Sequence, residues 1–388
     1  MRHERQLELL QRVADAGPTM RGLHGPASAV HSASEYTDRK RFDDEMRVLF
    51  REGVSFFALS CEMAEPGSYR SGMIGGVPIL VVRQTDGTLR AVVNACRHRG
   101  AALVDGSTTG RDLDVLQCRY HLWTYELDGT LRARPGSAGA FDDVTMNCDL
   151  HQRPVAERHG MIFVRASGDA PIDVDETLSG AEDDLGAFGL EDFVHIETRT
   201  IGRAMNWKLL LDTFTESYHI RGLHAETLAP VFDSNCIIHD AFGPNVLAVG
   251  FRSDITDEFA KPVDERSLLP YGTIQYFLVP NALLVHQVDH VELWRLEPEA
   301  VDRTRAVVSV FAPERPRSER SWTYFVKNLD LLLQVTGGED FPVMEQIQRN
   351  LESGALPEVV YGRNEAPLIH LHRSINDALA AAGCGPDH

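Results

Sequence analysis

The sequence predicts an α+β fold with two domains, on three observations. Short β-rich runs separated by Asp-Gly turns fill residues 54–166. A second set of strand-like runs lies between residues 194 and 311, and helical segments at 317–335 and 341–353 follow it. Strands followed by long helices are typical of an antiparallel sheet packed on helices, and 388 residues leave room for two domains.

The first 53 residues are predicted to be helical and separate from the β-rich runs. Residues 5–15 and 37–52 have the patterns of two short helices. In the second of these, Phe42, Met46 and Leu49 share one face, and Gly53 suits its C-terminal end. These residues are therefore expected to pack on another part of the chain as an N-terminal helical segment.

An acidic stretch separates the two predicted domains. Residues 173–193 contain eight acidic residues and neither Lys nor Arg. We interpret this stretch as a solvated connector that marks the domain boundary. After it we expect a strand at 194–205, a helix that begins at Asn206, and strands at 246–252, 272–279, 282–288, 290–297 and 304–311.

Composition excludes several classes of protein. A hydrophobic content of 43% is that of a globular protein, which argues against disorder. The net charge of −19 argues against nucleic-acid and anionic-membrane partners, which need clustered basic residues. We see neither a membrane-spanning apolar run nor a signal peptide, so we expect a cytoplasmic protein. In a reducing compartment the six cysteines are expected to be free thiols or metal ligands.

Residues 94–123 contain two mixed Cys/His pairs. The first is Cys96 and His98 in the run CRHRG, and the second is Cys118 and His121 in the run CRYHLW. A Cys₂His₂ zinc site is one interpretation, although zinc fingers usually group the two cysteines and the two histidines separately. The alternative is a [2Fe–2S] cluster in which two thiolates hold one iron and two imidazoles the other.

Together, C-x-H-R-G and C-x-Y-H-x-W resemble the Rieske motif, including residues beside the ligands. The resemblance implies that Cys96, His98, Cys118 and His121 bind a [2Fe–2S] cluster. It assigns residues 54–166 to an antiparallel β Rieske domain.

A second group of candidate ligands lies downstream. Glu216 and His219 are three residues apart and would share a helical face, whereas His219 and His224 would not on an unbroken helix. Gly222 could end the helix and bring His224 back toward His219. Two imidazoles and one carboxylate would form a facial triad for non-haem iron(II).

The carboxylate of this triad must come from elsewhere in the chain. Asp340 is one candidate, but an Asp ahead of Pro342 is equally a good helix N-cap. Glu339 is the neighbouring competitor. Chemistry alone leaves both assignments open.

Y-H-x₄-H preceded by N-W-K, with a later D-x₄-E-x-x-Q, is similar to the catalytic domain of the Rieske non-haem iron oxygenases, specifically their large (α) subunits. On that pattern His219, His224 and Asp340 fall on the mononuclear iron ligands. The resemblance covers residues 40 to 360 approximately and implies that residues 167–388 form a helix-grip domain, a sheet curved around a long helix, against which residues 1–53 pack. It also implies a homotrimer in which the cluster of one subunit supplies electrons to the iron of its neighbour.

Glu216 departs from the family pattern, which usually has Asp three residues before the first ligand histidine. A Glu keeps both acceptor oxygens, so we expect Glu216 to bridge His219 and His121 of a neighbouring subunit. Some family members that act on quaternary ammonium substrates look similar at this position.

The resemblance implies a terminal oxygenase component that hydroxylates an organic substrate by mono- or dioxygenation. We expect that substrate to be aromatic. O₂ is the oxidant, and NAD(P)H supplies electrons only indirectly, through a separate reductase or ferredoxin. Alternatives within the family are an oxidative demethylase and a quaternary-amine monooxygenase. From another class, the alternative is a Rieske electron carrier fused to a non-catalytic ligand-binding domain.

Some residues suit a substrate cavity as well as ordinary packing. His286 and His290 lie four apart in a strand-like run and are interpreted as pocket or sheet residues. Apolar residues that could line a cavity, or pack in the core, are Phe214, Phe232, Tyr276, Phe277 and Leu284.

Overall fold

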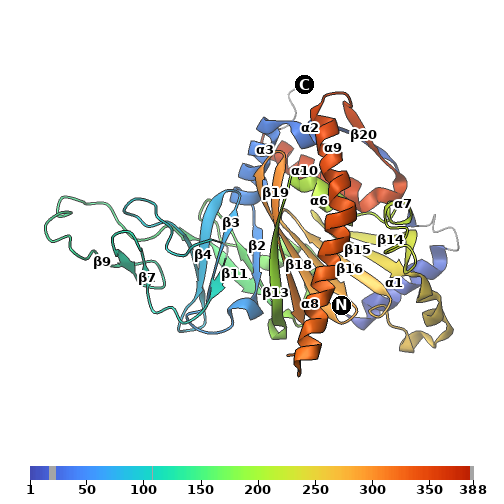
Figure 1. Ribbon diagram of the computed structural model, residues 1–388, viewed down its shortest axis with the longest axis horizontal. Helices are drawn as coiled ribbons and strands as arrows, with labels where there is room; N and C mark the ends of the chain where they lie inside the picture. The colour runs from blue at the N-terminus through green and yellow to red at the C-terminus, as the bar shows by residue number, and fades with distance from the viewer. Residues whose placement is uncertain (17–22, 107, 385–388) are drawn as a thin grey trace.

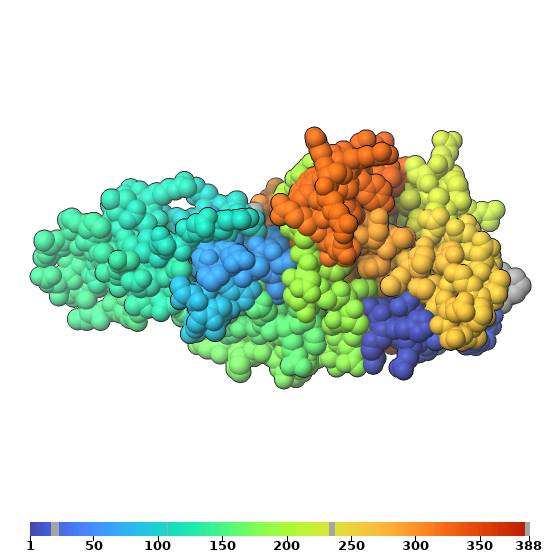
Figure 2. All heavy atoms as spheres, turned by 90° about the horizontal axis from the view of Figure 1, so that it is seen from below, coloured from blue at the N-terminus to red at the C-terminus, as the bar shows by residue number. Residues whose placement is uncertain are grey.

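The computed structural model describes residues 1–16, 23–106 and 108–384, which form two regions side by side (Figure 1). The small β strands of residues 55–164 occupy one end of the molecule, and a large sheet with its helices occupies the other. In the space-filling view, the region around residues 90–150 extends as a lobe away from the rest (Figure 2). The predicted α+β fold class is confirmed.

The N-terminal helix α1 (His3–Ala16) packs on the region of the large sheet. It buries Leu9, Leu10 and Val13 in a core shared with strands of that sheet. The next elements are β1 (Ala29–Ser32), α2 (Ser34–Thr37), α3 (Arg39–Glu45) and the π-helical η2 (Met46–Glu52). In α3 and η2, Phe42, Met46 and Leu49 are buried on one face.

Antiparallel strands form the small β region. One sheet has the order β10-β5-β4-β3-β6, a second β11-β12-β2 and a third β7-β8-β9. The Asp86-Gly87 turn joins β4 to β5: Gly87 has φ +82°, and the Asp86 carboxylate accepts a hydrogen bond from the Thr88 N–H at 2.9 Å. The strands are β2 (Ser55–Leu59), β3 (Tyr69–Ile74), β4 (Val77–Arg83), β5 (Leu89–Val93), β6 (Thr109–Gly110), β7 (Leu116–Gln117), β8 (Thr124–Tyr125), β9 (Leu131–Ala133), β10 (Gln152–Arg153), β11 (Val155–Arg158) and β12 (Met161–Val164), with the 3₁₀ turn η3 (Ser60–Met63).

The acidic stretch is not a simple solvated connector, and that prediction was wrong. It folds into α4 (Val174–Leu178), α5 (Glu182–Gly186) and the 3₁₀ turn η4 (Leu190–Asp192). Leu178 and Leu185 are fully buried, so apolar residues between the acidic ones pack into the core. Asp184 is buried too, and its carboxylate lies 3.4 Å from the Arg5 guanidinium on α1. The basic partners that the stretch lacks come from other parts of the chain, such as Arg5 on α1 and Arg158 on β11, which lies 2.7 Å from Asp175.

The large sheet has the order β13-β19-β18-β17-β16-β15-β14, with every pairing antiparallel. Figure 1 shows α8 and α9 crossing its strands as one long rod, the helix-grip arrangement. The elements are β13 (Val194–Arg203), α6 (Trp207–Phe214), α7 (Ile220–Leu223), β14 (Phe232–Phe242), β15 (Asn245–Arg252), the 3₁₀ segments η5 (Ser253–Ala260) and η6 (Val263–Glu265), β16 (Gly272–Leu278), β17 (Ala282–Gln287), β18 (His290–Ala300), β19 (Arg303–Ala312), α8 (Glu319–Val335), the π-helical η7 (Thr336–Asp340), α9 (Phe341–Glu352), β20 (Glu358–Tyr361), η8 (Arg363–Glu365) and α10 (Ala366–Ala381).

A continuous hydrophobic core joins the two regions. One cluster contains Ile79 and Val81 of the small β region together with Trp207 and Trp294 beneath the large sheet. The proposed divisions at residues 53 and 166 stay predictions, and residues 17–22, 107 and 385–388 of those ranges lie outside the described residues.

The N-W-K run begins α6 and anchors it to α3. The Asn206 side chain caps the helix by accepting a hydrogen bond from the Lys208 N–H at 3.0 Å. The Trp207 indole donates to Glu45 Oε2 at 2.9 Å, and the Lys208 ammonium donates to both Glu45 oxygens at 2.7 and 2.6 Å. Glu45 and Lys208 are almost completely buried, so each charge depends on the other for its solvation.

None of the helices in the described ranges is long and apolar enough to cross a membrane.

Candidate active site

Two loops of matching geometry hold the Cys/His pairs. In the first, the Gly100 N–H donates to the Cys96 carbonyl at 2.9 Å, and in the second the Leu122 N–H donates to the Cys118 carbonyl at 2.9 Å. Gly100 has φ +76° and Leu122 has φ +58°, so each loop turns through a left-handed residue four positions after its cysteine. Leu122 accepts a conformation that usually requires Gly, which indicates that the turn is held by its surroundings.

The four candidate ligands meet between these loops. Cys96 and Cys118 are buried, and the two ring Nδ1 atoms of His98 and His121 lie 3.2 Å apart. The His98 ring stacks on Trp123 with centroids 5.1 Å apart and planes 7° apart. Burial therefore restricts the two cysteine side chains, and stacking on Trp123 orients the His98 imidazole.

Electrostatics at this site favour neutral groups. Burial, together with the neighbouring Cys118, raises the pKa of the Cys96 thiol, while burial and the nearby His121 lower the pKa of His98. The Tyr125 hydroxyl lies 3.2 Å from Cys96 Sγ and accepts a hydrogen bond from the Arg97 N–H at 3.0 Å. Two cysteine sulfurs and two imidazole nitrogens are a donor set that fits a [2Fe–2S] cluster held by mixed ligands.

The second candidate centre brings His219, His224 and Asp340 together. Their ligand atoms lie within 4.8 Å of one another. His224 Nε2 lies 3.0 Å and His219 Nε2 lies 3.5 Å from the same oxygen, Asp340 Oδ1. This donor set fits a divalent iron ion with positions left for other ligands.

A broken helix presents the two histidines. Helix α6 ends at Phe214, and α7 is a single turn that begins after His219 and ends at Leu223, one residue after Gly222. His224 therefore leaves the helical path, and its ring centroid lies 5.1 Å from that of His219. The expectation that the chain breaks near Gly222 agrees with this geometry.

Asp340 is not a helix cap. It lies at the end of the π-helical η7, with helical backbone angles and no capping hydrogen bond from its side chain to α9. The Thr213 hydroxyl donates to Asp340 Oδ1 at 3.2 Å. The wider π turn directs the carboxylate to the histidines, which is a frequent use of π segments at functional sites.

Glu339 contacts His224 on the side of its ring that faces away from Asp340, a role that the sequence did not reveal. Its Oε2 lies 2.6 Å from His224 Nδ1 and accepts a hydrogen bond from the Thr227 hydroxyl at 2.8 Å. Burial would lower the pKa of His224, but Asp340 and Glu339 outweigh that effect and raise it. Glu339 thus orients the ring whose other nitrogen faces Asp340.

Glu216 contacts His219 directly. Its Oε1 is hydrogen-bonded to His219 Nδ1, and its Oε2 accepts the His219 backbone N–H at 3.1 Å. The Glu216 side chain is 11% exposed and that of His219 is 23% exposed, so the pair lies close to the surface. Figure 1 places α7, which follows His219, at the opposite end of the molecule from β7 and β9 beside the Cys/His loops.

A cavity of about 440 Å³ opens over the His219, His224 and Asp340 side chains. Of the apolar candidates, Phe214 and Phe232 line it, whereas Tyr276, Phe277 and Leu284 are core residues. His290 also lines it, while His286 packs against Phe188 at a centroid distance of 5.1 Å. The cavity further contains two carboxylates that sequence analysis did not single out, Asp289 and Glu292.

Two family models match the chain over both sites. The Rieske [2Fe-2S] domain matches residues 53–145, and the ring hydroxylating alpha subunit (catalytic domain) matches residues 190–381. The chain belongs to the Rieske non-haem iron oxygenase family. The [2Fe–2S] and mononuclear iron sites of that family are therefore the cofactor sites of these two domains.

Curated relatives match part of the chain. The glycine betaine monooxygenase oxygenase subunit of Chromohalobacter salexigens is 36% identical over 198 residues, which are 50% of this chain and 42% of the relative. The carnitine monooxygenase oxygenase subunit of Escherichia coli K12 is 31% identical over 248 residues, which are 61% of each chain. The chain thus spans under half the length of the first relative and under two thirds of the second.

Solved structures share the fold over most of their length. A quaternary ammonium Rieske monooxygenase in complex with L-carnitine superposes with a TM-score of 0.76 at 20% identity, covering 90% of this chain and 96% of that one. Naphthalene 1,2-dioxygenase with bound indole superposes with a TM-score of 0.71 at 18% identity, covering 94% of both chains. The fold is therefore common to relatives named for amine and for aromatic substrates.

Proposed function

We propose that the chain is the terminal oxygenase component of a multicomponent Rieske oxygenase. The observation that carries the proposal is the convergence of His219, His224 and Asp340 at the base of a 440 Å³ cavity. Cys96, His98, Cys118 and His121 would hold the cluster that supplies electrons, and the triad would hold the iron at which O₂ is activated.

The chain's own residues prepare this site for the reaction. Glu339 and Glu216 fix the ring orientation and tautomer of His224 and His219, and Thr213 holds the Asp340 carboxylate. Phe214, Phe232 and other apolar side chains line the cavity and exclude bulk water from the reacting position.

We propose a small cationic amine as the substrate class. Carboxylates of Glu292 and Asp289 face the same cavity as the aromatic rings of Phe214 and Tyr324, and such a set stabilises a cation by charge and by cation–π contact. Glu292 is 5% exposed and its Oε1 lies 3.5 Å from His290 Nε2, so a bound cation would share this buried carboxylate with the imidazole. The named relatives act on glycine betaine and carnitine, which favours the quaternary-amine alternative over the aromatic substrate expected first.

The Glu292→Gln variant tests this substrate class. We expect the concentration of a quaternary amine that gives the half-maximal single-turnover rate to rise about 10-fold, a loss of ~1.4 kcal/mol, with the limiting rate little changed, because the substitution removes a coulombic attraction in the substrate complex. Dithionite-reduced protein is mixed with O₂ and with increasing concentrations of glycine betaine, L-carnitine or aromatic acids, and the rate of product formation in a single turnover is measured at each concentration.

Glu299→Gln on the same strand is the matched control, because Glu299 is 41% exposed and bonded to Arg303. It should behave as the wild type. Turnover of aromatic acids but not of amines by the wild type would reject the amine proposal. Equal half-saturating amine concentrations in Glu292→Gln and Glu299→Gln would reject it as well.

Electron supply and assembly form part of the proposal. A separate reductase or ferredoxin in the cytoplasm would deliver NAD(P)H-derived electrons to the cluster. In Figure 1, α7 beside the proposed iron site lies far from β7 and β9 beside the Cys/His loops, so we propose a homotrimer in which Glu216 joins His219 to the neighbouring subunit's cluster ligand His121. If the chain were a fused electron carrier without catalysis, it would lack the mononuclear iron. If the Cys/His loops held a structural zinc ion, the chain would lack the cluster.

A further inference from the structure

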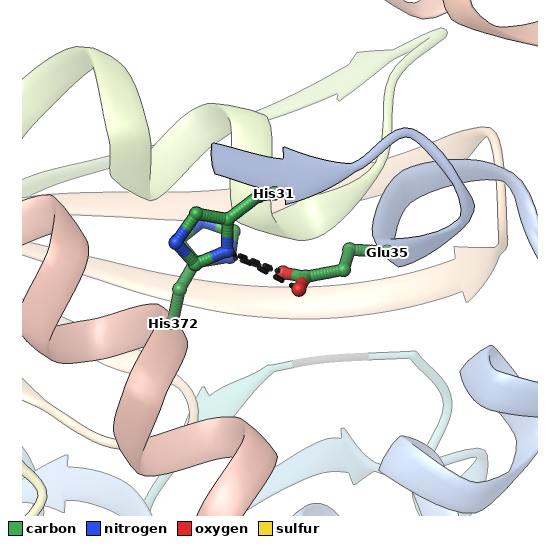
Figure 3. A group of neighbouring side chains, drawn as sticks. All are labelled: His31, Glu35 and His372. Atoms are coloured by element: carbon green, nitrogen blue, oxygen red, sulfur yellow. Dashed lines mark hydrogen bonds and ion pairs between the residues drawn. The ribbon is translucent and has the colours of Figure 1, made fainter. Parts of the chain in front are cut away.

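A second group of two imidazoles and one carboxylate lies away from the candidate active site. His31, Glu35 and His372 offer ligand atoms within 4.8 Å of one another, from β1, α2 and α10 (Figure 3). His31 Nδ1 lies 3.2 Å from both Glu35 oxygens, and His372 Nδ1 lies 2.8 Å from Glu35 Oε2. Figure 3 shows the two rings converging on one carboxylate.

The distances suit a metal ion shared by the three side chains. Ligands bound to zinc at about 2.0–2.1 Å in a tetrahedron are separated from each other by roughly 3.3 Å. The spacings of 3.2 and 2.8 Å come close to that value, so only small side-chain shifts would be needed. The side chains of His31, Glu35 and His372 are 10%, 9% and 1% exposed.

Outer hydrogen bonds orient two of the three side chains, His372 and Glu35. His372 presents Nδ1 to Glu35 while its Nε2 lies 2.9 Å from Asp212 Oδ1, the carboxylate–histidine arrangement that commonly supports bound metals. The Asn376 amide donates to Glu35 Oε1 at 3.2 Å. These contacts leave the face between the two Nδ1 atoms and the Glu35 carboxylate as the shared position.

We infer that His31, Glu35 and His372 form a zinc site that ties the N-terminal β1–α2 segment to α10. Zinc is favoured over iron because this donor set binds Zn²⁺ more tightly than Fe²⁺. Burial of all three side chains separates the site from the substrate cavity, whose lining includes none of them. The ion therefore has a structural role.

A proton is the competing occupant of this position. Burial alone would lower the pKa of His372, but Asp212 and Glu35 raise it to about 9, so the metal-free ring is an imidazolium between two carboxylates. Arg41, with its guanidinium 3.9 Å from Glu35, adds further positive charge. Zinc must displace the proton on Nδ1, so its binding should release a proton to the buffer.

Zinc addition to the iron-loaded, cluster-containing full chain tests the inference. After one equivalent of Zn²⁺ and dialysis, elemental analysis should find about one zinc per chain with the iron content unchanged. Zinc K-edge X-ray absorption should report two imidazoles, an oxygen ligand and no sulfur. His31→Gln and Glu35→Gln should each lose this zinc, and with it the zinc-dependent rise in Tm.

Matched controls separate this site from the other metal sites. His370→Gln, on the same helix as His372, and Glu358→Gln, on β20 beside β1, should keep the zinc. His219→Gln should keep it as well. Failure of the wild type to retain zinc, sulfur ligands, retention in both His31→Gln and Glu35→Gln, or loss in His219→Gln would each overturn the inference.

Discussion

Glu216→Ala is expected to keep both metal centres and lose product formation by at least about 10–100-fold. Glu216 contacts His219 through Nδ1 and through the backbone N–H, so its removal takes away the proposed link from the cluster to the iron. In a single turnover with pre-reduced protein, substrate and O₂, the cluster should stay reduced, as followed by its visible absorption and EPR signal.

Glu226→Ala is the matched control for this prediction, because Glu226 is an exposed carboxylate close in sequence to the same site. It should oxidise its cluster at the wild-type rate. Glu216→Gln keeps one acceptor oxygen and should also be strongly impaired. Wild-type turnover in both Glu216 variants would exclude the bridging role.

Glu45→Ala is expected to destabilise the chain by about 3–5 kcal/mol, because it leaves the Lys208 ammonium buried without its carboxylate. Glu45 is fully buried and accepts from Lys208, Trp207 and Arg41, so no water can replace it cheaply. Burial already lowers the pKa of Lys208 in spite of Glu45. The change is measured as the free energy of urea unfolding of the metal-loaded protein.

A double variant separates lost charge pairing from lost packing. Glu45→Met with Lys208→Met removes both charges at similar volume and should recover most of the stability. Lys40→Met breaks an exposed pair with Asp44 at 3.6 Å and should cost less than about 1 kcal/mol. If Glu45→Ala and Lys40→Met lower the free energy of unfolding equally, the buried Glu45–Lys208 pair is no more important for stability than an exposed pair.

Short-range patterns pointed to the candidate ligands because each group of them depends mainly on local geometry. Each Cys/His pair lies within one loop that is closed by its own backbone hydrogen bonds. The short sequence motif is therefore enough to predict the local conformation of the loop. His219 and His224 lie on either side of a one-turn helix, and Gly222 signalled the break. The choice between Asp340 and Glu339 needed the resemblance, because the π-helical turn that places Asp340 beside both histidines and Glu339 behind His224 has no sequence signature.

Long-range packing explains what the sequence did not reveal. The acidic stretch resembled a solvated connector because its basic partners, such as Arg5, come from a helix far away in the chain. In the cluster of His31, Glu35 and His372, the carboxylate of Glu35 contacts His372, which lies 337 positions later in the sequence. Glu292 lines the cavity because of the register of β18, and that register is determined only in the assembled sheet.

The most direct test of the account is the iron content of the purified chain and of its Asp340→Ala variant, measured together with the EPR spectrum after reduction. The two-centre assignment predicts about three iron atoms per chain in the wild type and about two in Asp340→Ala, with an unchanged rhombic cluster signal. Two iron atoms in both proteins would contradict a mononuclear iron at His219, His224 and Asp340. A colourless protein without that EPR signal would contradict the cluster.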